Sequence, residues 1–227
     1  HVFCFMKAII LAGARGTRLT NSAKNLPKGL VEVRGKPLLE HQIELLKKHG
    51  MDDIRLALGY RADQVINYLD GKHEHVVEKE PLGTGGAIQF ASKDLTDPFM
   101  VVNGDIISDV DVAAFAKAHE PGKNMLVTSH HKANTDFGLL DVDEDSRINR
   151  FLEKPTEPTD GHVNVGFYIL EPEIFKDMQD TRFSIEHDIF PNLARSGKLH
   201  AFHHDGFWSD LGTEERYQAA QENKQNL

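Results

Sequence analysis

The sequence predicts an α/β fold built on a central mixed, mostly parallel sheet. Short apolar runs, of the kind buried in parallel sheets, alternate with segments of helical periodicity through the first half of the chain. Strands and helices alternating at this spacing form crossover units, which pack helices on both faces of a sheet. The 227 residues, 40 % of them hydrophobic, are enough to bury a substantial core. We therefore expect a Rossmann-like three-layer sandwich.

The first half supplies the alternating elements in order. Strands are predicted at residues 7–12, 53–60, 75–78 and 99–105, and helices at 37–50, 62–69 and 85–92. In the first helix, Leu39, Ile43 and Leu46 fall at helical spacing, Pro37 stands at a first-turn position and Gly50 marks the end. In an open α/β sheet, ligands bind at the carboxyl ends of the strands, so the loops that follow these strands are the places to search.

The second half contains more strand. Strands are predicted at 125–129, 137–142, 148–152 and 163–170, and helices at 172–178, 185–195 and 213–223. Asp109 and Asp111 form a D-x-D, which in a glycosyltransferase would bind a metal. We favour a helix cap, because Val112 and Phe115 begin an amphipathic segment directly afterwards. Since no Pro/Gly/Ser-rich linker interrupts the chain, we expect a single domain over residues 6–227, with 1–5 a leader or added residues.

Charge and cysteine content narrow the function. The formal net charge of −9 argues against nucleic-acid binding, which usually needs a basic surface. Residues 6–36 are nevertheless basic, with seven Lys or Arg and one Glu, which suits a small polyanion; a solvated basic face is an equal alternative. No apolar run approaches the roughly 20 residues of a membrane span. Because Cys4 is the sole cysteine, no intramolecular disulfide can form, and we expect a cytoplasmic protein.

A glycine loop follows the first strand, at residues 13–18 (GARGTR). It does not fit the G-x-G-x-x-G dinucleotide fingerprint, and no P-loop motif is present. Backbone N–H groups of such a loop can cradle phosphate oxygens, and Arg15 and Arg18 could add charge-assisted hydrogen bonds. A tight turn carrying surface arginines is the structural alternative.

Nine sequence blocks together resemble the sugar-1-phosphate nucleotidyltransferase family. They are LAGARGTRL (11–19), PKGLVEV (27–33), GKPLLEH (35–41), EPLGTGGAI (80–88), VVNGD (101–105), FLEKP (151–155), VNVGFYIL (163–170), FSIEHDIFP (183–191) and WSDLGTEERY (208–217). Each block alone is weakly specific, but nine in the family's order are highly specific. The chain departs from the family pattern at Ala14, at residues 21–23 and at Glu32, which leaves the loop path and base preference open. It is most similar to compact mannose/heptose-1-phosphate guanylyltransferase-like members.

The resemblance implies a reaction, a cofactor and a set of site residues. Family members, of the nucleotide-diphospho-sugar transferase fold, transfer a nucleoside monophosphate from an NTP to a sugar 1-phosphate with Mg²⁺, releasing pyrophosphate. By resemblance the catalytic residues are Arg18, Lys28 and Asp105. The implied nucleotide-binding residues are Leu11, Ala12, Gly13, Ala14, Gly16, Thr17, Arg18, Lys28, Gly83, Thr84, Gly85, Asn103 and Asp105. The implied sugar-phosphate residues are Gly138, Glu153, Lys154 and Asn164, and the implied metal ligands are Asp105 and Asp210.

Structural and functional alternatives stay open at this point. Lys28 could be a surface lysine after Pro27, either metal aspartate could cap a turn or helix, and Glu153 with Lys154 could be a solvated pair. GTP with mannose or heptose 1-phosphate is favoured. Uridylyl transfer to N-acetylmuramate 1-phosphate or another hexose 1-phosphate is the alternative within the class. A nucleotide-sugar-dependent glycosyltransferase and a non-catalytic nucleotide-sugar binder are the alternatives outside it.

Two further expectations concern metals and assembly. His200, His203 and His204 lie close in the sequence, but without an H-E-x-x-H motif or a partner cysteine they do not favour zinc. The expected partners are the two substrates, with neither nucleic acid nor membrane. The oligomeric state is not legible from the sequence, and a homodimer is one option.

Overall fold

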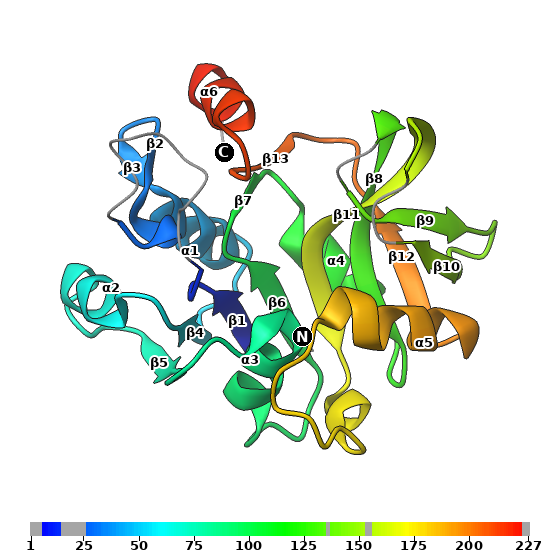
Figure 1. Cartoon of the computed structure of the whole chain (residues 1–227), viewed down its shortest axis with the longest axis horizontal. Coiled ribbons are helices and arrows are strands. Elements are labelled where there is room, and N and C mark those ends of the chain that lie inside the picture. Colours follow the sequence, from blue (N-terminus) through cyan, green and yellow to red (C-terminus); the bar gives the residue numbers. More distant parts are fainter. Residues whose placement is uncertain (1–5, 15–25, 135–136, 153–155, 224–227) are drawn as a thin grey trace.

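A mixed sheet forms the centre of the molecule in the computed structural model, which describes residues 6–14, 26–134, 137–152 and 156–223 (Figure 1). Within these ranges the sheet has nine strands in the order β10-β9-β11-β6-β1-β4-β5, with β8 pairing β11 and β12 pairing β8. The bounds are β1 Ala8–Leu11, β4 Ile54–Leu58, β5 Glu74–Val77, β6 Phe99–Asn103, β8 Asn124–Asn134, β9 Leu139–Val142, β10 Ile148–Leu152, β11 Thr159–Leu170 and β12 Leu199–His203.

The amino-terminal half of the sheet is parallel. Strand β1 lies between β4 and β6, and Ile9 is in register with Arg55 on one side and Val101 on the other. Strand β11 then runs antiparallel to β6 and to β8. This arrangement brings the carboxyl ends of β1, β4 and β6 to one edge, where a ligand site is expected.

Helices cover both faces of the sheet, because successive strand residues point to opposite sides. Ile10 packs in one core with residues of α1 (Leu38–Lys48), α2 (Ala62–Tyr68) and α4 (Val112–Ala118). Ile9 packs in a second core with residues of α3 (Gly83–Ser92) and α5 (Phe190–Arg195). In Figure 1, α3 and α5 lie in front of the sheet and α4 behind it. The α/β fold with a mixed sheet between two helical layers is confirmed.

Several short elements were not expected from the sequence. They are η2 (Lys28–Leu30), β2 (Glu32–Val33), β3 (Lys36–Pro37), β7 (Ile106–Ser108) and β13 (Trp208–Asp210), together with the longer strand β12. Helix α6 (Glu214–Glu222) follows β13 and matches the helix expected at 213–223. Two- and three-residue strands are too short to carry a recognisable period, which explains why β2, β3, β7 and β13 were missed.

Two predicted helices were wrong in detail. The helix expected at 185–195 is a π-helical turn, η4 (Ile185–Ile189), followed by α5. Pro191 stands in the first turn of α5 and has no N–H to continue an α-helical ladder from the preceding turn. The helix expected at 172–178 is only a 3₁₀ turn, η3 (Pro172–Phe175).

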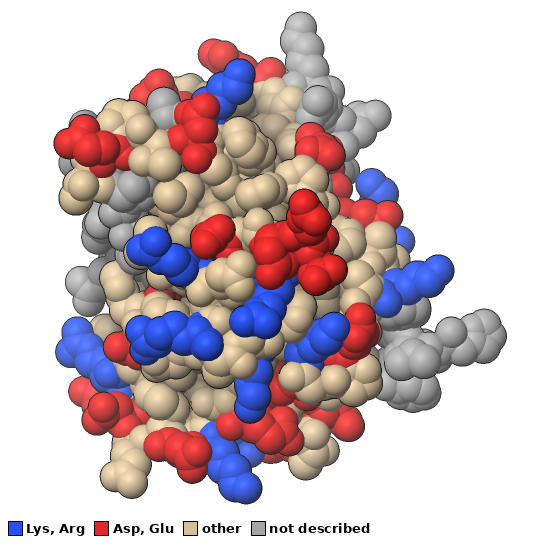
Figure 2. All heavy atoms as spheres, turned by 90° about the vertical axis from the view of Figure 1, so that its right-hand side faces the viewer, with Lys and Arg blue, Asp and Glu red and all other residues tan. Residues whose placement is uncertain are grey.

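The surface carries both signs of charge. Figure 2 faces the side of the molecule with β9, β10 and α5, where acidic and basic side chains are interspersed rather than forming a continuous basic surface. Among the helices that the structure describes, none is long and apolar enough to cross a membrane.

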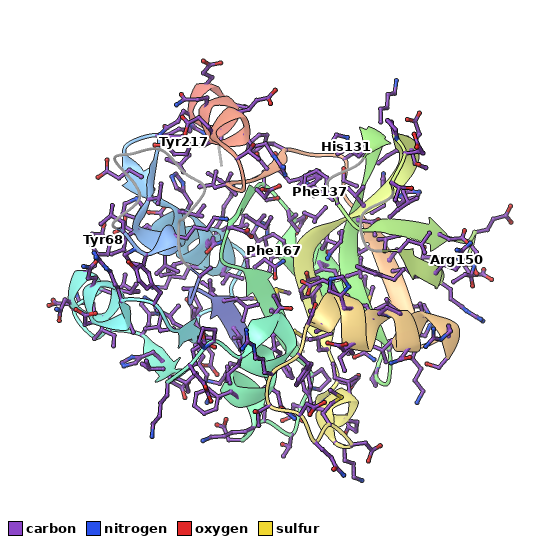
Figure 3. All side chains as sticks on the ribbon, in the orientation of Figure 1. Tyr68, His131, Phe137, Arg150, Phe167 and Tyr217 are labelled. Atoms are coloured by element: carbon purple, nitrogen blue, oxygen red, sulfur yellow. The ribbon has the colours of Figure 1, made fainter. Side chains whose placement is uncertain are left out.

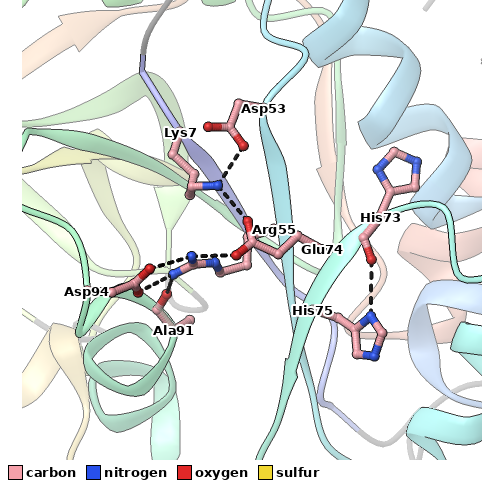
Figure 4. A network of polar contacts seen from close by, with 8 residues as sticks. All are labelled: Lys7, Asp53, Arg55, His73, Glu74, His75, Ala91 and Asp94. Atoms are coloured by element: carbon pink, nitrogen blue, oxygen red, sulfur yellow. Dashed lines mark hydrogen bonds and ion pairs between the residues drawn. The ribbon is translucent and has the colours of Figure 1, made fainter.

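A polar network ties the starts of β1, β4 and β5 together, away from the strands' carboxyl ends (Figure 4). The Arg55 side chain is only 5 % exposed and donates to Asp94 at 2.6 and 2.7 Å and to Glu74 at 2.6 Å. Lys7 completes the network, with its Nζ 2.6 Å from both Asp53 and Glu74. Because a buried guanidinium needs acceptors, these carboxylates contribute to stability rather than to a ligand site.

Asp94→Asn tests the contribution of this network to stability. Hydrogen bonds from Arg55 lower the pKa of Asp94 to about 2, against 3.8 for the free group. A lowered folded-state pKa stabilises the protein above pH 3.8, and this contribution is lost as the pH falls toward 2. Since Asp94 is more than half exposed, we expect the variant to lose only about 1 kcal/mol in urea unfolding at pH 7.

The loss should be much smaller near pH 2, where about half of wild-type Asp94 is itself protonated. Asp97→Asn, which removes an exposed aspartate three residues further on, is the control and should change the unfolding free energy little at either pH. A deficit of equal size at pH 7 and pH 2 would contradict the assignment.

Candidate functional site

A cavity of about 670 Å³ opens at the carboxyl ends of the parallel strands. Its lining comes from the loop after β1, the residues after β4 and β5, the start of α3 and the loop after β6. Of the expected nucleotide-binding residues, Leu11, Gly13, Ala14, Gly83, Thr84, Asn103 and Asp105 line it. Ala12 is buried beside it and donates its N–H to the Ala57 carbonyl at 2.9 Å.

Gly104 allows the loop after β6 to cross the end of β1. A Cβ at this position would lie 1.8 Å from the carbonyl oxygen of Leu11, a distance that no side chain can adopt. The chain therefore turns tightly against β1, and Asp105 emerges at the edge of the cavity. The glycine in the NGD sequence is a packing requirement of this crossing.

Lys28 and Asp105 form an ion pair although they are 77 residues apart. Lys28 Nζ lies 2.9 Å from Asp105 Oδ2, and the lysine side chain is 12 % exposed. Lys28 begins the short turn η2, and its N–H donates to the Ala14 carbonyl at 3.3 Å. The structure thus brings two of the three expected catalytic residues together beside the glycine loop.

Asp210 reaches the same place through the pairing of β7 with β13. Asp210 is in register with Ile106, and the N–H of Leu211 donates to the Asp105 carbonyl at 2.8 Å. The Asp210 side chain is 11 % exposed; Oδ1 accepts from the Gly212 N–H at 2.6 Å, and Oδ2 pairs with Arg216. Asp105 directly precedes β7 and Asp210 ends β13, so the pairing of these two strands joins the segments that carry the two expected metal aspartates.

The donor set fits magnesium. Mg²⁺ in proteins is commonly held by one or two carboxylates, with water and phosphate oxygens completing its shell. Asp105 and Asp210 supply two such carboxylates, and each forms an ion pair with a basic side chain of the chain itself. In the described ranges no group of three or more His, Cys, Asp or Glu could hold a metal ion, so substrate oxygens would have to complete the shell.

A buried tyrosine joins the expected nucleotide side to the expected sugar side. The hydroxyl of Tyr168 on β11 accepts hydrogen bonds from Asn103 Nδ2 at 3.0 Å and from Asn164 Nδ2 at 2.9 Å. Desolvation raises the pKa of Tyr168 well above its usual value, so the hydroxyl stays neutral. Asn164, which lies on β11, also donates its backbone N–H to the Gly138 carbonyl at 3.3 Å. Hydrogen bonds therefore connect the expected site residues Asn103, Asn164 and Gly138.

The start of α3 packs against the segment before α5. A Cβ on Gly83, whose φ is +74°, would lie 2.5 Å from the Phe183 carbonyl oxygen, and one on Gly85 would lie 2.3 Å from the Phe183 ring. Thr84 Oγ1 donates to Glu186 Oε2 at 2.6 Å. Gly83 and Thr84 line the cavity with Glu186, whereas the space beside Gly85 is filled by Phe183.

Sequence reasoning missed Glu78. Burial raises its pKa, and its carboxylate accepts from the Leu82 N–H at 3.3 Å. A Cβ on Gly59 would lie 2.5 Å from Glu78 Oε1, so the carboxylate occupies the floor of the cavity between strand ends. Glu78 is the first residue after β5, and the rule that ligands gather at strand ends could have identified it.

Two other polar residues of the site were also missed, namely Glu186 and Arg216. Glu186 lies in the π-helical turn η4, where an irregular helix often marks a functional site. Arg216 stands in the first turn of α6. An arginine at such a position looks like a surface residue in the sequence.

Five expected site residues lie outside the described residues: Gly16, Thr17, Arg18, Glu153 and Lys154. The leader 1–5 lies outside them as well.

The D-x-D sequence and the histidines have other partners. Asp111 caps α4 by accepting from the Ala114 N–H at 2.8 Å, so the predicted cap is confirmed. Asp109 instead lies 3.2 Å from His204 Nε2. His203 pairs with Asp205 at 2.7 Å.

Comparisons with known proteins identify the family of the chain. The sequence model described as nucleotidyl transferase matches residues 7–226. Mannose-1-phosphate guanyltransferase from Emericella nidulans is 39 % identical over 91 % of this chain and 61 % of its own length, and that from Schizosaccharomyces pombe is 37 % identical over 93 % and 62 %. The chain thus spans about three fifths of the length of these relatives.

Solved structures are similar over nearly the whole chain. HddC from Yersinia pseudotuberculosis, complexed with GMP-PN, has a TM-score of 0.82 and 32 % identity, and the match covers 96 % of this chain and 99 % of that one. A putative glucose-1-phosphate thymidylyltransferase from Bacillus anthracis has a TM-score of 0.85 at 23 % identity, covering 98 % and 97 %, and supports the fold alone.

Tyr168→Phe tests the buried junction between Asn103 and Asn164. Removing the hydroxyl leaves two partly buried amide donors without their acceptor, which should lower the free energy of unfolding by about 1–2 kcal/mol. Denaturant unfolding measures this directly. Tyr68→Phe is a matched control, because its hydroxyl bonds Glu40 on the surface, and it should cost less than about 0.5 kcal/mol. Equal small losses in both variants would argue against the junction.

Proposed function

The chain belongs to the nucleotidyl transferase family, and from this premise we propose that it transfers a nucleoside monophosphate from an NTP to a sugar 1-phosphate. GTP and mannose or heptose 1-phosphate are the favoured substrates. The observation that carries the proposal is the Lys28–Asp105 pair beside Asp210 at the edge of the cavity. The similarity to enzymes named mannose-1-phosphate guanyltransferase and to HddC with GMP-PN supports the substrate class.

The reaction needs positioning and charge neutralisation more than covalent help. A phosphate oxygen of the sugar 1-phosphate attacks the α-phosphorus, the new P–O bond forms, and the bond to the β-phosphate oxygen breaks to release pyrophosphate. Both reactants are anions, so fixed cations lower the barrier. The Lys28 ammonium is largely buried at the cavity edge and can offset charge on the triphosphate. Arg18, Gly16 and Thr17 of the glycine loop are proposed to join it.

Asp105 and Asp210 are proposed to hold Mg²⁺. When bound, the ion would offset negative charge on the substrate phosphates. The chain's own part is to present one carboxylate from the turn before β7 and the other from β13, with the Leu211 N–H fixing the backbone at Asp105.

On the sugar side, Asn164 and Gly138 are proposed to orient the sugar 1-phosphate, together with Glu153 and Lys154. The Tyr168 hydroxyl holds the Asn164 amide group in one orientation. The same hydroxyl holds Asn103, so the groups proposed for the two substrates share one fixed point.

Glu78 supports a preference for guanine as the base of the nucleotide. A carboxylate only accepts hydrogen bonds, and guanine presents two adjacent donors, N1–H and the 2-amino group, that match it. Uracil presents one N–H between two carbonyl oxygens, which a carboxylate would repel. The half-buried Glu78 on the cavity floor therefore favours GTP over UTP, and it disfavours the uridylyltransferase alternative.

The remaining expectations stay proposals. Residues 6–227 are proposed to form one domain, supported by the sheet that runs through both halves of the described chain. A cytoplasmic setting is supported by the single cysteine. The glycosyltransferase alternative is weakened, because Asp109 and Asp111 have separate structural partners. Pyrophosphate release separates the proposal from both alternatives outside the class.

Mixing each of the four NTPs with mannose or heptose 1-phosphate and Mg²⁺ tests the proposal. We expect pyrophosphate release to be fastest with GTP. Asp105→Asn should reduce turnover at least about 100-fold, because it removes both a metal ligand and the partner of Lys28. Asp97→Asn, an exposed aspartate away from the cavity, should leave turnover unchanged. Absence of pyrophosphate with every nucleotide, or a near-normal rate in Asp105→Asn, would overturn the proposal.

Glu78→Gln tests the base preference and its pH dependence. Replacing one acceptor oxygen by an amino group should weaken GTP binding about 10- to 100-fold and leave UTP binding little changed. Because burial raises the pKa of Glu78, wild-type affinity for GTP should fall as the pH drops through that raised value and the carboxylate is protonated. The Glu78→Gln variant should lose this dependence.

Calorimetry between pH 5 and 8 measures both effects, with an identical nucleotide series at each pH. Glu80→Gln is the matched control, since Glu80 also lines the cavity two residues further on. It should keep both the preference and the pH profile. Unchanged discrimination between GTP and UTP in Glu78→Gln would remove Glu78 from base recognition.

A further inference from the structure

Both proposed metal aspartates face a cation supplied by the chain itself. Lys28 pairs with Asp105, and Arg216 pairs with Asp210. Lys28 has a proposed part in the reaction, because it can offset phosphate charge. Arg216 has no such part, although it holds the less exposed of the two carboxylates.

The Asp210 carboxylate is engaged at both oxygens. Oδ1 accepts from the Gly212 N–H at 2.6 Å, and Oδ2 pairs with an Arg216 amino group. A Cβ on Gly212 would lie 2.3 Å from Oδ1, so the turn is built closely around this carboxylate. The Asp210 and Arg216 side chains are 11 % and 25 % exposed, so water screens their attraction only partly.

A metal ion approaching Asp210 would meet the Arg216 guanidinium. Two like charges on one carboxylate in a partly buried place repel strongly. The guanidinium therefore has to leave Oδ2, or its presence weakens metal binding. The guanidinium has a second contact that does not involve Asp210. Arg216 Cζ lies 5.0 Å from the centre of the Phe137 ring, a distance at which a cation is attracted to an aromatic face.

The Arg216–Asp210 pair is not needed to attach α6. Tyr217 Oη and Gln221 Nε2 both donate to the Glu32 carbonyl at 3.0 Å, and Arg34 N–H donates to Gln221 Oε1 at 2.6 Å. Ala220 is fully buried in the same contact. These bonds dock the helix on β2 independently of Arg216, so attachment of α6 does not require the Arg216–Asp210 pair.

We propose that Arg216 is a positioning residue that competes with the metal ion for Asp210 and so sets the metal affinity of the site. The inference rests on the proposed function, since it takes Asp105 and Asp210 as metal ligands. In the metal-free protein Arg216 keeps the Asp210 carboxylate oriented and neutralised. When the metal ion binds, the guanidinium gives up Oδ2 and keeps its contact with Phe137.

Phe137 links Arg216 to the residues proposed to bind the sugar 1-phosphate. Phe137 directly precedes Gly138, a proposed sugar-phosphate residue, and its ring lies 5.0 Å from that of Trp208 and 5.5 Å from that of His131. Figure 3 shows Phe137 and His131 next to each other beside the chain that leads into β13. Arg216 therefore contacts the residue next to Gly138, and its release from Asp210 would take place close to the proposed sugar-phosphate residues.

Mn²⁺ binding to the nucleotide-free protein tests the competition, with free Mn²⁺ counted by electron paramagnetic resonance. We expect Arg216→Gln to bind Mn²⁺ about tenfold more tightly than wild type, because it removes one charged hydrogen bond to the shared carboxylate. Arg195→Gln is the matched control; it removes an exposed arginine of α5 that bonds Asn192 and should leave Mn²⁺ binding unchanged. Adding Asp210→Asn to Arg216→Gln should abolish the gain.

Arg216→Lys is a second variant, in case Arg216→Gln does not fold. Lysine keeps the charge but cannot reproduce the planar contact, so a smaller gain in affinity is expected. Unchanged or weaker Mn²⁺ binding in the folded Arg216 variants would overturn the inference, as would a gain that survives Asp210→Asn. Pyrophosphate release by the wild-type protein distinguishes failure of this inference from failure of the proposed function. If the wild type turns over but the Arg216 variants show no gain in Mn²⁺ affinity, only this inference is overturned. If the wild type does not turn over, the proposed function is overturned.

Discussion

The missing side chain at position 104 is the constraint on which the candidate site depends. The Leu11 carbonyl occupies the place where a Cβ would stand, at 1.8 Å. This contact lets the chain turn directly after β6, so β7 leaves the sheet and pairs with β13. That pairing joins residues 105 and 210 across half the chain, through the bond from the Leu211 N–H to the Asp105 carbonyl. The position of both aspartates therefore follows from one close backbone approach.

Binding a polyanionic substrate in this cavity requires a source of positive charge, because the cavity itself is acidic. Four carboxylates line it, from Glu78, Glu80, Asp105 and Glu186. Three of them have a donor from the chain: the Leu82 N–H for Glu78, Lys28 for Asp105, and the Thr84 and Ser184 hydroxyls for Glu186. A phosphate group would still be repelled unless positive charge comes with it. The basic segment 6–36 and a divalent ion are the two sources that the proposal uses.

The sequence predicted those features that local physics determines. Apolar runs predicted the strands β1, β4, β6 and β11, because each is buried on both faces. Asp105 was identified through the resemblance of its sequence block to the family, and it also follows such a run. Strands β7 and β13 were missed because three residues carry no periodicity, although their pairing brings Asp210 into the site. The π-helical turn before Pro191 was missed because it depends on packing between distant segments, with Glu186 bonded to Thr84.

The residues that sequence reasoning missed share a physical property: their roles depend on partners far along the chain. Glu78 is an ordinary acid in the sequence, and its raised pKa comes from burial beneath residues of the β1 and β4 loops. In the sequence Arg216 is an ordinary residue in the first turn of a helix, and only the fold shows that it pairs with Asp210 of β13. The burial of Glu78 and the Arg216–Asp210 ion pair both need the tertiary fold, so the local sequence does not show the environment of either side chain. They are also where one sequence family can change its substrate or metal affinity without altering its fold, because neither side chain is needed to form the sheet.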